Sequence, residues 1–192
     1  MKIVELEAIP FTIPYRKPLR FASGEVHVAD HVLVRVHTDD GVVGAAEAPP
    51  RPYTYGETQE SIVAVVEKLF APALTGLTLL EREVAHARME RTVGNPAAKA
   101  AVDMAIWDAL GRTLGFPVTQ LLGGFTDRGA RVAHAHRSSS RRAGELSNFL
   151  DMSDDLLTEP LTIAGGELAV PPGPGTGIDI DPEKLTRYRT DR

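Results

Sequence analysis

Apolar and polar side chains alternate along two stretches near the start of the chain, which is the pattern of half-buried β-strands. These stretches are residues 3–13 and 31–38, and a third apolar run covers residues 42–48. Asp39-Asp40-Gly41 separates the last two, and an Asp-Gly pair in that position is typical of a hairpin. Prolines follow the first stretch, so we expect a loop over residues 14–29. The pattern predicts a three-stranded antiparallel meander.

The alternation also assigns faces to the predicted strands. In the first strand, Val4, Leu6 and Ala8 share one face. In the second, three valines point inward, and the opposite face carries His31, Arg35 and His37. One side of the sheet is therefore expected to be the buried side.

From Thr54 the apolar spacing changes to three and four residues, which is the period of an α-helix. Thr54 and Glu57 have the spacing of a capping box, and Thr78 and Glu81 repeat it before a second helix that ends near Val93. The apolar stripe of the first helix is Ile62, Val65, Val66 and Leu69.

A third helix is expected to begin with Asn95 as N-cap and Pro96 as first residue, and to end at Gly115. Its predicted buried face is Val102, Ala105, Ile106, Ala109, Leu110 and Leu114. Small residues on one flank, Ala98, Ala101 and Ala105, would let another backbone approach closely. Strands followed by helices in the first 124 residues predict an α+β layered domain.

The regular pattern stops after residue 128. Residues 129–144 have no steady period and are rich in arginine, as in a solvated linker. Pattern returns in residues 145–192, where Gly165-Gly166 predicts a small hairpin and Asp181-Pro182 predicts the start of a last short helix. We therefore divide the chain into residues 1–128, an irregular basic seam, and a C-terminal segment.

The amino-acid composition argues against several classes of function. The net charge of −5 argues against nucleic acid as the main partner, and the absence of cysteine excludes disulfides and thiolate metal sites. No apolar run approaches the roughly 18 residues of a membrane span, so no membrane association is expected. The first residues show strand-like alternation instead of a signal peptide, and a cytoplasmic protein is the expectation.

The segment Asn95 to Gly124 closely resembles a signature of the enolase superfamily, in its mandelate racemase and muconate-lactonising branch. The matching features are the alanine-rich face, Asp103, Trp107-Asp108, Gly111-Arg112 and the Leu-Leu-Gly-Gly ending. The upstream segments at 10–25, 31–44 and 47–62 look most like muconate cycloisomerases, and the segment from Ser147 to Leu185 is similar to the family's C-terminal end.

The resemblance implies a capping domain that covers the mouth of a (β/α) barrel, with a C-terminal segment that returns to pack against the cap. It implies that a complete member carries Lys-x-Lys, a third lysine and three acidic ligands of Mg²⁺ or Mn²⁺ in the barrel. The implied parental reaction is lactonisation of cis,cis-muconate through an enolate. Alternatives are an N-acylamino acid racemase parent and a non-catalytic binding or oligomerisation module.

The chain has no room for that barrel. A complete barrel takes about 200–250 residues, whereas only the seam separates the two matching segments. No two of the five lysines have Lys-x-Lys spacing; they are Lys2, Lys17, Lys68, Lys99 and Lys184. We therefore assign no catalytic residue, metal ligand or cofactor to this chain and expect no catalysis by it alone. Residues 131–134 are a possible remnant of the first barrel strand.

Two cap loops, by resemblance, contact the substrate of a complete enzyme, at about residues 17–28 and 49–56. The candidates there are Phe21, Arg51, Tyr53 and Tyr55. Arginine and tyrosine suit a planar, doubly charged dicarboxylate, so a small carboxylate is the expected substrate. The competing interpretation is that Tyr53 and Tyr55 only pack at the start of the first helix.

Other constellations carry weaker signals. His134 and His136 would share a strand face but lack an obvious third metal ligand. Asp151, Asp154 and Asp155 lack the remaining residues of an EF-hand and are expected to form a solvated acidic helix start. The glycines of residues 171–177 lack the Lys-Ser/Thr of a phosphate loop.

Removal of a barrel should expose the apolar face of the cap, so self-association is expected.

Overall fold

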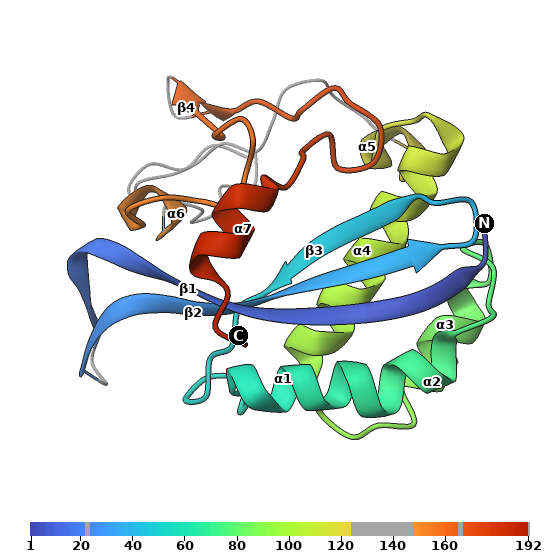
Figure 1. Cartoon of the computed structure of the whole chain (residues 1–192), viewed down its shortest axis with the longest axis horizontal. Helices are drawn as coiled ribbons and strands as arrows, with labels where there is room; N and C mark the ends of the chain where they lie inside the picture. The colour runs from blue at the N-terminus through green and yellow to red at the C-terminus, as the bar shows by residue number, and fades with distance from the viewer. Residues whose placement is uncertain (22–23, 124–147, 165–166, 192) are drawn as a thin grey trace.

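The computed structural model describes residues 1–21, 24–123, 148–164 and 167–191. An antiparallel sheet of order β1-β2-β3 forms its centre, from β1 (Ile3–Phe21), β2 (Gly24–Thr38) and β3 (Val43–Ala48). Helices α1 to α4 lie on one face, and the C-terminal segment lies on the other (Figure 1). The predicted α+β meander with a returning segment is confirmed. The seam at 129–144, the proposed strand remnant and both of its histidines lie outside the described residues.

The expected loop over residues 14–29 was wrong. β1 and β2 continue as a long hairpin in which Pro14 lies opposite Val28 and Leu19 opposite Val26. Proline is tolerated here because β1 is an edge strand, where a missing amide hydrogen need not break a ladder. An irregularity between Pro14 and Leu19 absorbs the residues that do not pair.

The predicted faces are correct except at the first residues of β1. Leu6 and Ala8 are buried with the valines of β2, but Val4 is exposed and Ile3 is buried instead. A register shift between Ile3 and Glu5 inverts the alternation at this point. Sequence periodicity alone does not reveal such a shift.

The first helix is capped by Thr58, not by Thr54. The helix is a continuous run of α1 (Gln59–Val65), the π-helical turn η1 (Val66–Phe70) and α2 (Ala71–Leu74). Thr58 and Ser61 form the capping box, with each side chain bonded to the other residue's amide. The π turn rotates the apolar stripe, so that Phe70 is buried and the predicted Leu69 is 50% exposed.

Glu57 has a different role from the predicted one. Its buried carboxylate accepts hydrogen bonds from the amides of Ala97 and Ala98, at 2.8 and 3.0 Å. These amides open α4 (Pro96–Leu114), so Glu57 caps a helix about forty residues further along the chain. Asn95 is the N-cap residue of α4 as predicted, with φ 57°, but its side chain donates to the Val93 carbonyl and makes no capping bond.

The remaining helical predictions are mostly correct. α3 (Arg82–Met89) follows the Thr78–Glu81 contact, although it ends before Val93. Gly115 ends α4 in a left-handed conformation, and the short α5 (Val118–Leu121) follows. The predicted α4 face is buried, apart from the exposed Leu114.

The close backbone approach predicted for α4 occurs against β3. A Cβ built on Gly44 would lie 2.1 Å from the carbonyl oxygen of Ala105 and 2.4 Å from the amide nitrogen of Ala109. Only glycine leaves room for this contact. The sheet and helices α1 to α4 therefore enclose one continuous apolar core.

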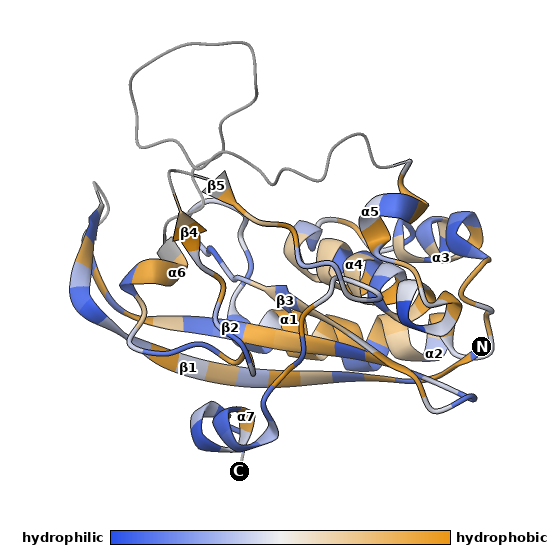
Figure 2. Ribbon diagram, turned by 90° about the horizontal axis from the view of Figure 1, so that it is seen from above, coloured by the Kyte–Doolittle hydropathy of each residue, from blue (hydrophilic) through white to orange (hydrophobic). Residues whose placement is uncertain are grey.

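The other face of the sheet is also covered. Here the C-terminal segment adds α6 (Asn148–Asp151), the predicted hairpin as β4 (Ile163–Ala164) and β5 (Glu167–Leu168), and α7 (Pro182–Tyr188). Both helices lie on this same face of the sheet, and Figure 2 shows α7 next to β1. The second core contains Ile9, Phe11, Ile13, Ala29, Leu33, Met152, Leu156 and Leu185. His31, on this face, is consequently buried.

Asp181 caps α7 as predicted, because its carboxylate accepts from the amides of Glu183 and Lys184. Within the described ranges, no helix has both the length and the apolar character needed to cross a bilayer.

Candidate functional site

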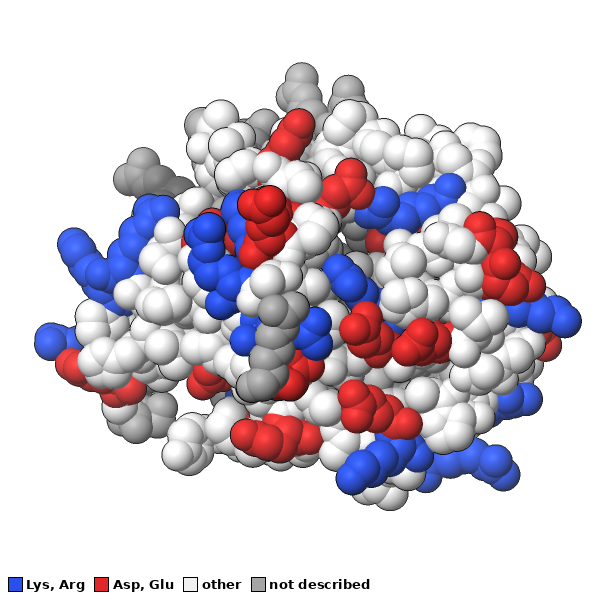
Figure 3. Space-filling model, in the orientation of Figure 1, with Lys and Arg blue, Asp and Glu red and all other residues white. Residues whose placement is uncertain are grey.

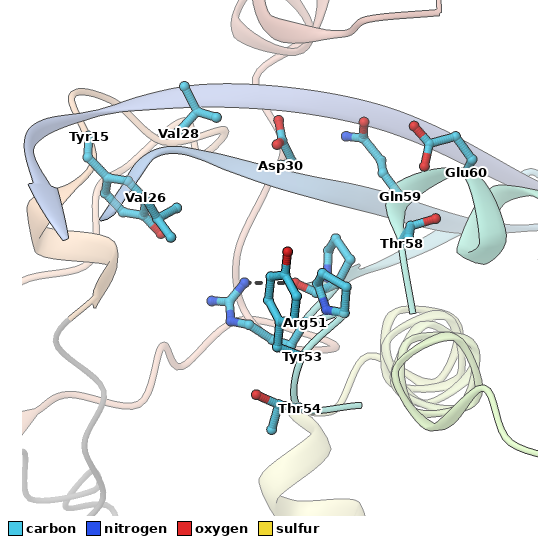
Figure 4. Close-up of a pocket in the computed structure, with 12 residues that line it drawn as sticks. Tyr15, Val26, Val28, Asp30, Arg51, Tyr53, Thr54, Thr58, Gln59 and Glu60 are labelled. Carbon is cyan, nitrogen blue, oxygen red and sulfur yellow. Dashed lines mark hydrogen bonds between the residues drawn. The ribbon is translucent and has the colours of Figure 1, made fainter. Parts of the chain in front are cut away.

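A cavity of about 470 Å³ lies between the β1–β2 hairpin and the loop after β3. In Figure 4, Tyr15 and Val26 descend from the hairpin toward Arg51 and Tyr53. The start of α1 contributes the third wall, including Gln59. The two loops that were predicted to contact substrate thus meet around one space.

Arg51 provides the cavity with a positive charge. Its guanidinium donates to the carbonyl oxygen of Pro50 at 3.0 Å. Among the described residues, no carboxylate lies within ion-pair distance of it. A guanidinium with free donors is suited to binding a carboxylate.

Tyr15 forms the opposite wall and was not predicted as a site residue. Partial burial raises the pKa of its phenol, and the positive charge of Arg51 opposes that rise. Carboxylates of Glu47, Asp151 and Asp30 favour the neutral phenol as well. Tyr15 is therefore a neutral hydrogen-bonding group at ordinary pH. Because residues 14–29 were predicted to be a loop, the sequence did not indicate that Tyr15 lies on a strand facing the cavity.

The cavity is mixed in charge. Asp30 lines it from β2 and accepts a hydrogen bond from the hydroxyl of Thr12 at 2.6 Å. Glu60 lines it from α1, where its own amide and the Thr58 side chain lower the pKa of its carboxyl. Gln59 donates to the carbonyl oxygens of Phe11 and His31, which fixes the helix start to both strands.

Two of the four predicted substrate contacts line this cavity. Arg51 and Tyr53 line the cavity, whereas Tyr55 is not among the lining residues. Phe21 pairs with Gly24 at the hairpin end, and its side chain lies outside the described atoms. Tyr53 is 91% exposed, so the packing role considered for it at the helix start is wrong.

Asp108 and Arg112 of the signature bind the C-terminal segment. Asp108 is 1% exposed and accepts from the Ala45 amide at 2.9 Å, the Thr176 amide at 2.7 Å and the Thr176 hydroxyl at 2.9 Å. Arg112 donates to Asp108 at 2.9 Å and to Asp179 at 2.8 Å, and also contacts the Ile178 carbonyl. These residues join α4, β3 and the returning chain.

Asp103 and Trp107 of the same signature join α3 to α4. Arg82 lies over the Trp107 ring, with 3.7 Å between the guanidinium carbon and the ring centroid, and it donates to Asp103. The Asp103 carboxylate also contacts His86 at 3.0 Å. The signature residues therefore join α4 to its neighbours through ion pairs, hydrogen bonds and one cation–π contact.

The predicted solvated acidic helix start is wrong, because Asp151 is the last residue of α6. Asp154 and Asp155 follow α6 and both contact the ammonium of Lys184, at 3.3 and 3.0 Å. Gly175, in the glycine-rich turn, packs against Asp108 instead of forming a phosphate loop.

The described residues do not fit the divalent metal that the resemblance implies. Histidine and carboxylate side chains in the described ranges form no group of three or more able to hold a metal ion. Figure 3 shows positive and negative side chains interspersed, and the described part of this face carries no continuous basic surface.

Comparison with known proteins identifies the family of the cap fold described above. Residues 4–123 match the family described as "Mandelate racemase / muconate lactonizing enzyme, N-terminal domain". The chain is 38% identical over 128 residues to the L-Ala-D/L-Glu epimerase of Bacillus subtilis, covering 66% of this chain and 35% of that protein. It is 39% identical over 127 residues to muconate cycloisomerase 1 of Rhodococcus opacus, covering 65% and 34%.

A solved structure extends the similarity. The muconate lactonizing enzyme from Mucobacterium smegmatis, complexed with muconolactone, superposes with a TM-score of 0.94 at 38% identity. This match covers 100% of both chains. The substrate-liganded Bacillus subtilis epimerase gives 0.65 at 35% identity, covering 69% and 37%. The chain spans about a third of the length of the curated relatives it matches.

Proposed function

The chain belongs to the mandelate racemase / muconate lactonizing enzyme family of the enolase superfamily, of which it holds the N-terminal capping domain, and we propose that its cavity binds the substrate of a small-carboxylate isomerase. The observation that supports this most strongly is the meeting of both cap loops around a space lined by the Arg51 guanidinium, which has no carboxylate partner among the described residues. Arg51 would bind a carboxylate, while Tyr15 and Tyr53 would contact the carbon skeleton and limit access of water. We also propose that Tyr55 and Phe21 contact the substrate once the cap loops have closed over it.

The proposed parental reaction is lactonisation of cis,cis-muconate. The match to a muconate lactonizing enzyme over the entire chain supports it, including the part beyond residue 123. We divide the chain into a cap at 1–128, a seam at 129–144 and a C-terminal segment at 145–192. In this proposal a barrel is missing at the seam, so the chain binds its ligand without converting it, and Mg²⁺ or Mn²⁺ acts only in a complete enzyme.

A second candidate is epimerisation or racemisation of an acylated amino acid. The 38% identity to the L-Ala-D/L-Glu epimerase favours it. Asp30 and Glu60 would also suit a ligand with a positively charged group better than they suit a dianion. If neither ligand binds, the remaining candidate is a non-catalytic oligomerisation module.

Titration with cis,cis-muconate should shift the amide NMR signals of Arg51 and Tyr53, because both residues line the cavity. Arg51→Gln should weaken binding about tenfold, since a charge-assisted hydrogen bond contributes about 1.5 kcal/mol or more. Arg35→Gln is the matched control, because Arg35 lies outside this cavity. With Mn²⁺ added, the diene absorbance should stay constant.

Each outcome of this titration is informative. Binding of L-Ala-L-Glu in place of muconate would select the second candidate. Absence of shifts with both ligands would exclude the cavity as their site. Loss of the diene absorbance would show that the chain is catalytically competent.

Self-association is our proposal for the exposed apolar residues around the end of α4 and the end of α5. Leu114 and Phe116 are exposed at the end of α4, and Leu122 is exposed directly after α5; exposed apolar side chains can mediate association. Light scattering should detect species heavier than the 20.7 kDa monomer. Leu122→Lys should reduce their mass, whereas Leu80→Lys, at an equally exposed site in the turn before α3, should not. A monodisperse monomer that binds no hydrophobic dye would exclude the proposal.

A further inference from the structure

The wall of the cavity around Tyr15 has little support from its own sheet. Pairing between β1 and β2 keeps one register from Glu5 to Pro14 and resumes at Leu19, and within the described strands the residues between Pro14 and Leu19 have no partner on β2. β1 is also an edge strand, so its outer side has no neighbouring strand of the sheet. Residues 15–18 must therefore be held by something else.

The C-terminal segment provides that support. The Ser153 amide donates to the carbonyl oxygen of Pro14 at 2.8 Å, and Met152 forms an antiparallel bridge with Tyr15. Met152 is buried in the second core, whose neighbours include the Tyr15 ring. The backbone of Tyr15 is thus paired with a residue about 137 positions later in the chain.

Lys184 fixes the residues around Met152. Its ammonium contacts Asp155 at 3.0 Å, Asp154 at 3.3 Å and the carbonyl oxygen of Leu157 at 2.8 Å. The Asp155 hydrogen bond is the largest influence raising the pKa of Lys184, so the ammonium is charged. Lys184 therefore joins α7 to the 152–157 stretch.

Arg112 fixes the same segment to α4. Besides Asp108, its guanidinium binds Asp179 and the Ile178 carbonyl. The backbone continues this connection, because the Thr158 amide donates to the Asp179 carbonyl oxygen at 3.0 Å. A Cβ on Gly111 would lie 2.7 Å from the Cα of Gly175, so the returning loop sits directly on α4.

We propose that Arg112 and Lys184 are positioning residues for the cavity, and that they act through the C-terminal segment to hold Tyr15 in its wall. Neither residue lines the cavity itself. Supporting shells of this kind decide how accurately a binding group is placed. The functional consequence rests on the proposed role of the cavity, whereas the placement of Tyr15 does not.

The test is the titration of Tyr15 in the full chain, observed by NMR of ¹³C-labelled tyrosine and assigned with Tyr15→Phe. Burial raises the pKa of this phenol, and the charged groups that act on it are Arg51, Glu47, Asp151 and Asp30. Lys184→Met and Arg112→Gln should each move the pKa back toward that of a free tyrosine, because the released wall exposes the phenol. Hydrogen exchange at the Ser153 amide should accelerate in the same variants.

Matched variants separate positioning from general destabilisation. Lys184→Arg should restore the Tyr15 titration of the native chain. Lys99→Gln removes a lysine that pairs with Glu90, away from this segment, and should change neither readout. An unchanged Tyr15 titration in folded Lys184→Met would overturn the inference, as would an equal shift in Lys99→Gln. If Arg112→Gln does not fold, Lys184→Met alone decides. None of these outcomes depends on muconate or dipeptide binding.

Discussion

Replacing Asp108 with alanine should lower the free energy of unfolding by about 3–5 kcal/mol, the range found when one partner of a buried ion pair is removed. The carboxylate is almost fully buried. It accepts hydrogen bonds from the Ala45 amide, the amide and hydroxyl of Thr176, and the Arg112 guanidinium. Alanine would leave these donors without an acceptor in the interior. Urea unfolding followed by circular dichroism measures the change.

Asp179→Ala is the matched control for this variant. Asp179 also binds Arg112, at 2.8 Å, but its side chain is 70% exposed. An ion pair with one exposed partner contributes about 1 kcal/mol or less. Equal effects of the two substitutions would show that burial of Asp108 does not set its importance.

Gly44→Ala should destabilise the chain by about 3 kcal/mol or more, at the upper end of overpacking effects. The new methyl carbon would lie within 2.4 Å of two backbone atoms of α4, and neither atom can rotate away. β3 must therefore separate from α4, which opens the larger core. The loss should appear as a lower urea midpoint with an unchanged slope.

Gly41→Ala distinguishes steric overlap from backbone strain. Gly41 has a φ of 80° but nothing lies within 4 Å of its Cβ position. Its substitution should cost about 1 kcal/mol, from the left-handed conformation alone. If Gly44→Ala is no worse than Gly41→Ala, the contact with α4 is looser than described.

The predictions that succeeded depend on local patterns. Alternation along β2 and the three-and-four spacing in α4 each reflect a periodic surface that must be buried. Gly115 and Asp181 were identified correctly because the end of a helix is specified by adjacent residues. The family signature was recognisable for the same reason.

The predictions that failed depend on distant partners. Glu57 looked like the cap of the next helix, but its partners lie in α4. Prolines indicated a loop because the sequence does not show that β1 is an edge strand. Tyr15 became part of the site only through a hairpin that was read as a loop. No local signal identifies Asp108 as the acceptor for Thr176.

The contact between Asp108 and Thr176 has a consequence for how the family's chains can vary in length. The two residues are 68 positions apart, and their contact closes a loop of that size. Loop-closure entropy grows only with the logarithm of length, at about 0.6 kcal/mol for each doubling. A chain that carried a barrel of about 200 residues between them would pay roughly two doublings, about 1.2 kcal/mol. The Asp108–Thr176 contact therefore tolerates large differences in the length of the chain between the two residues.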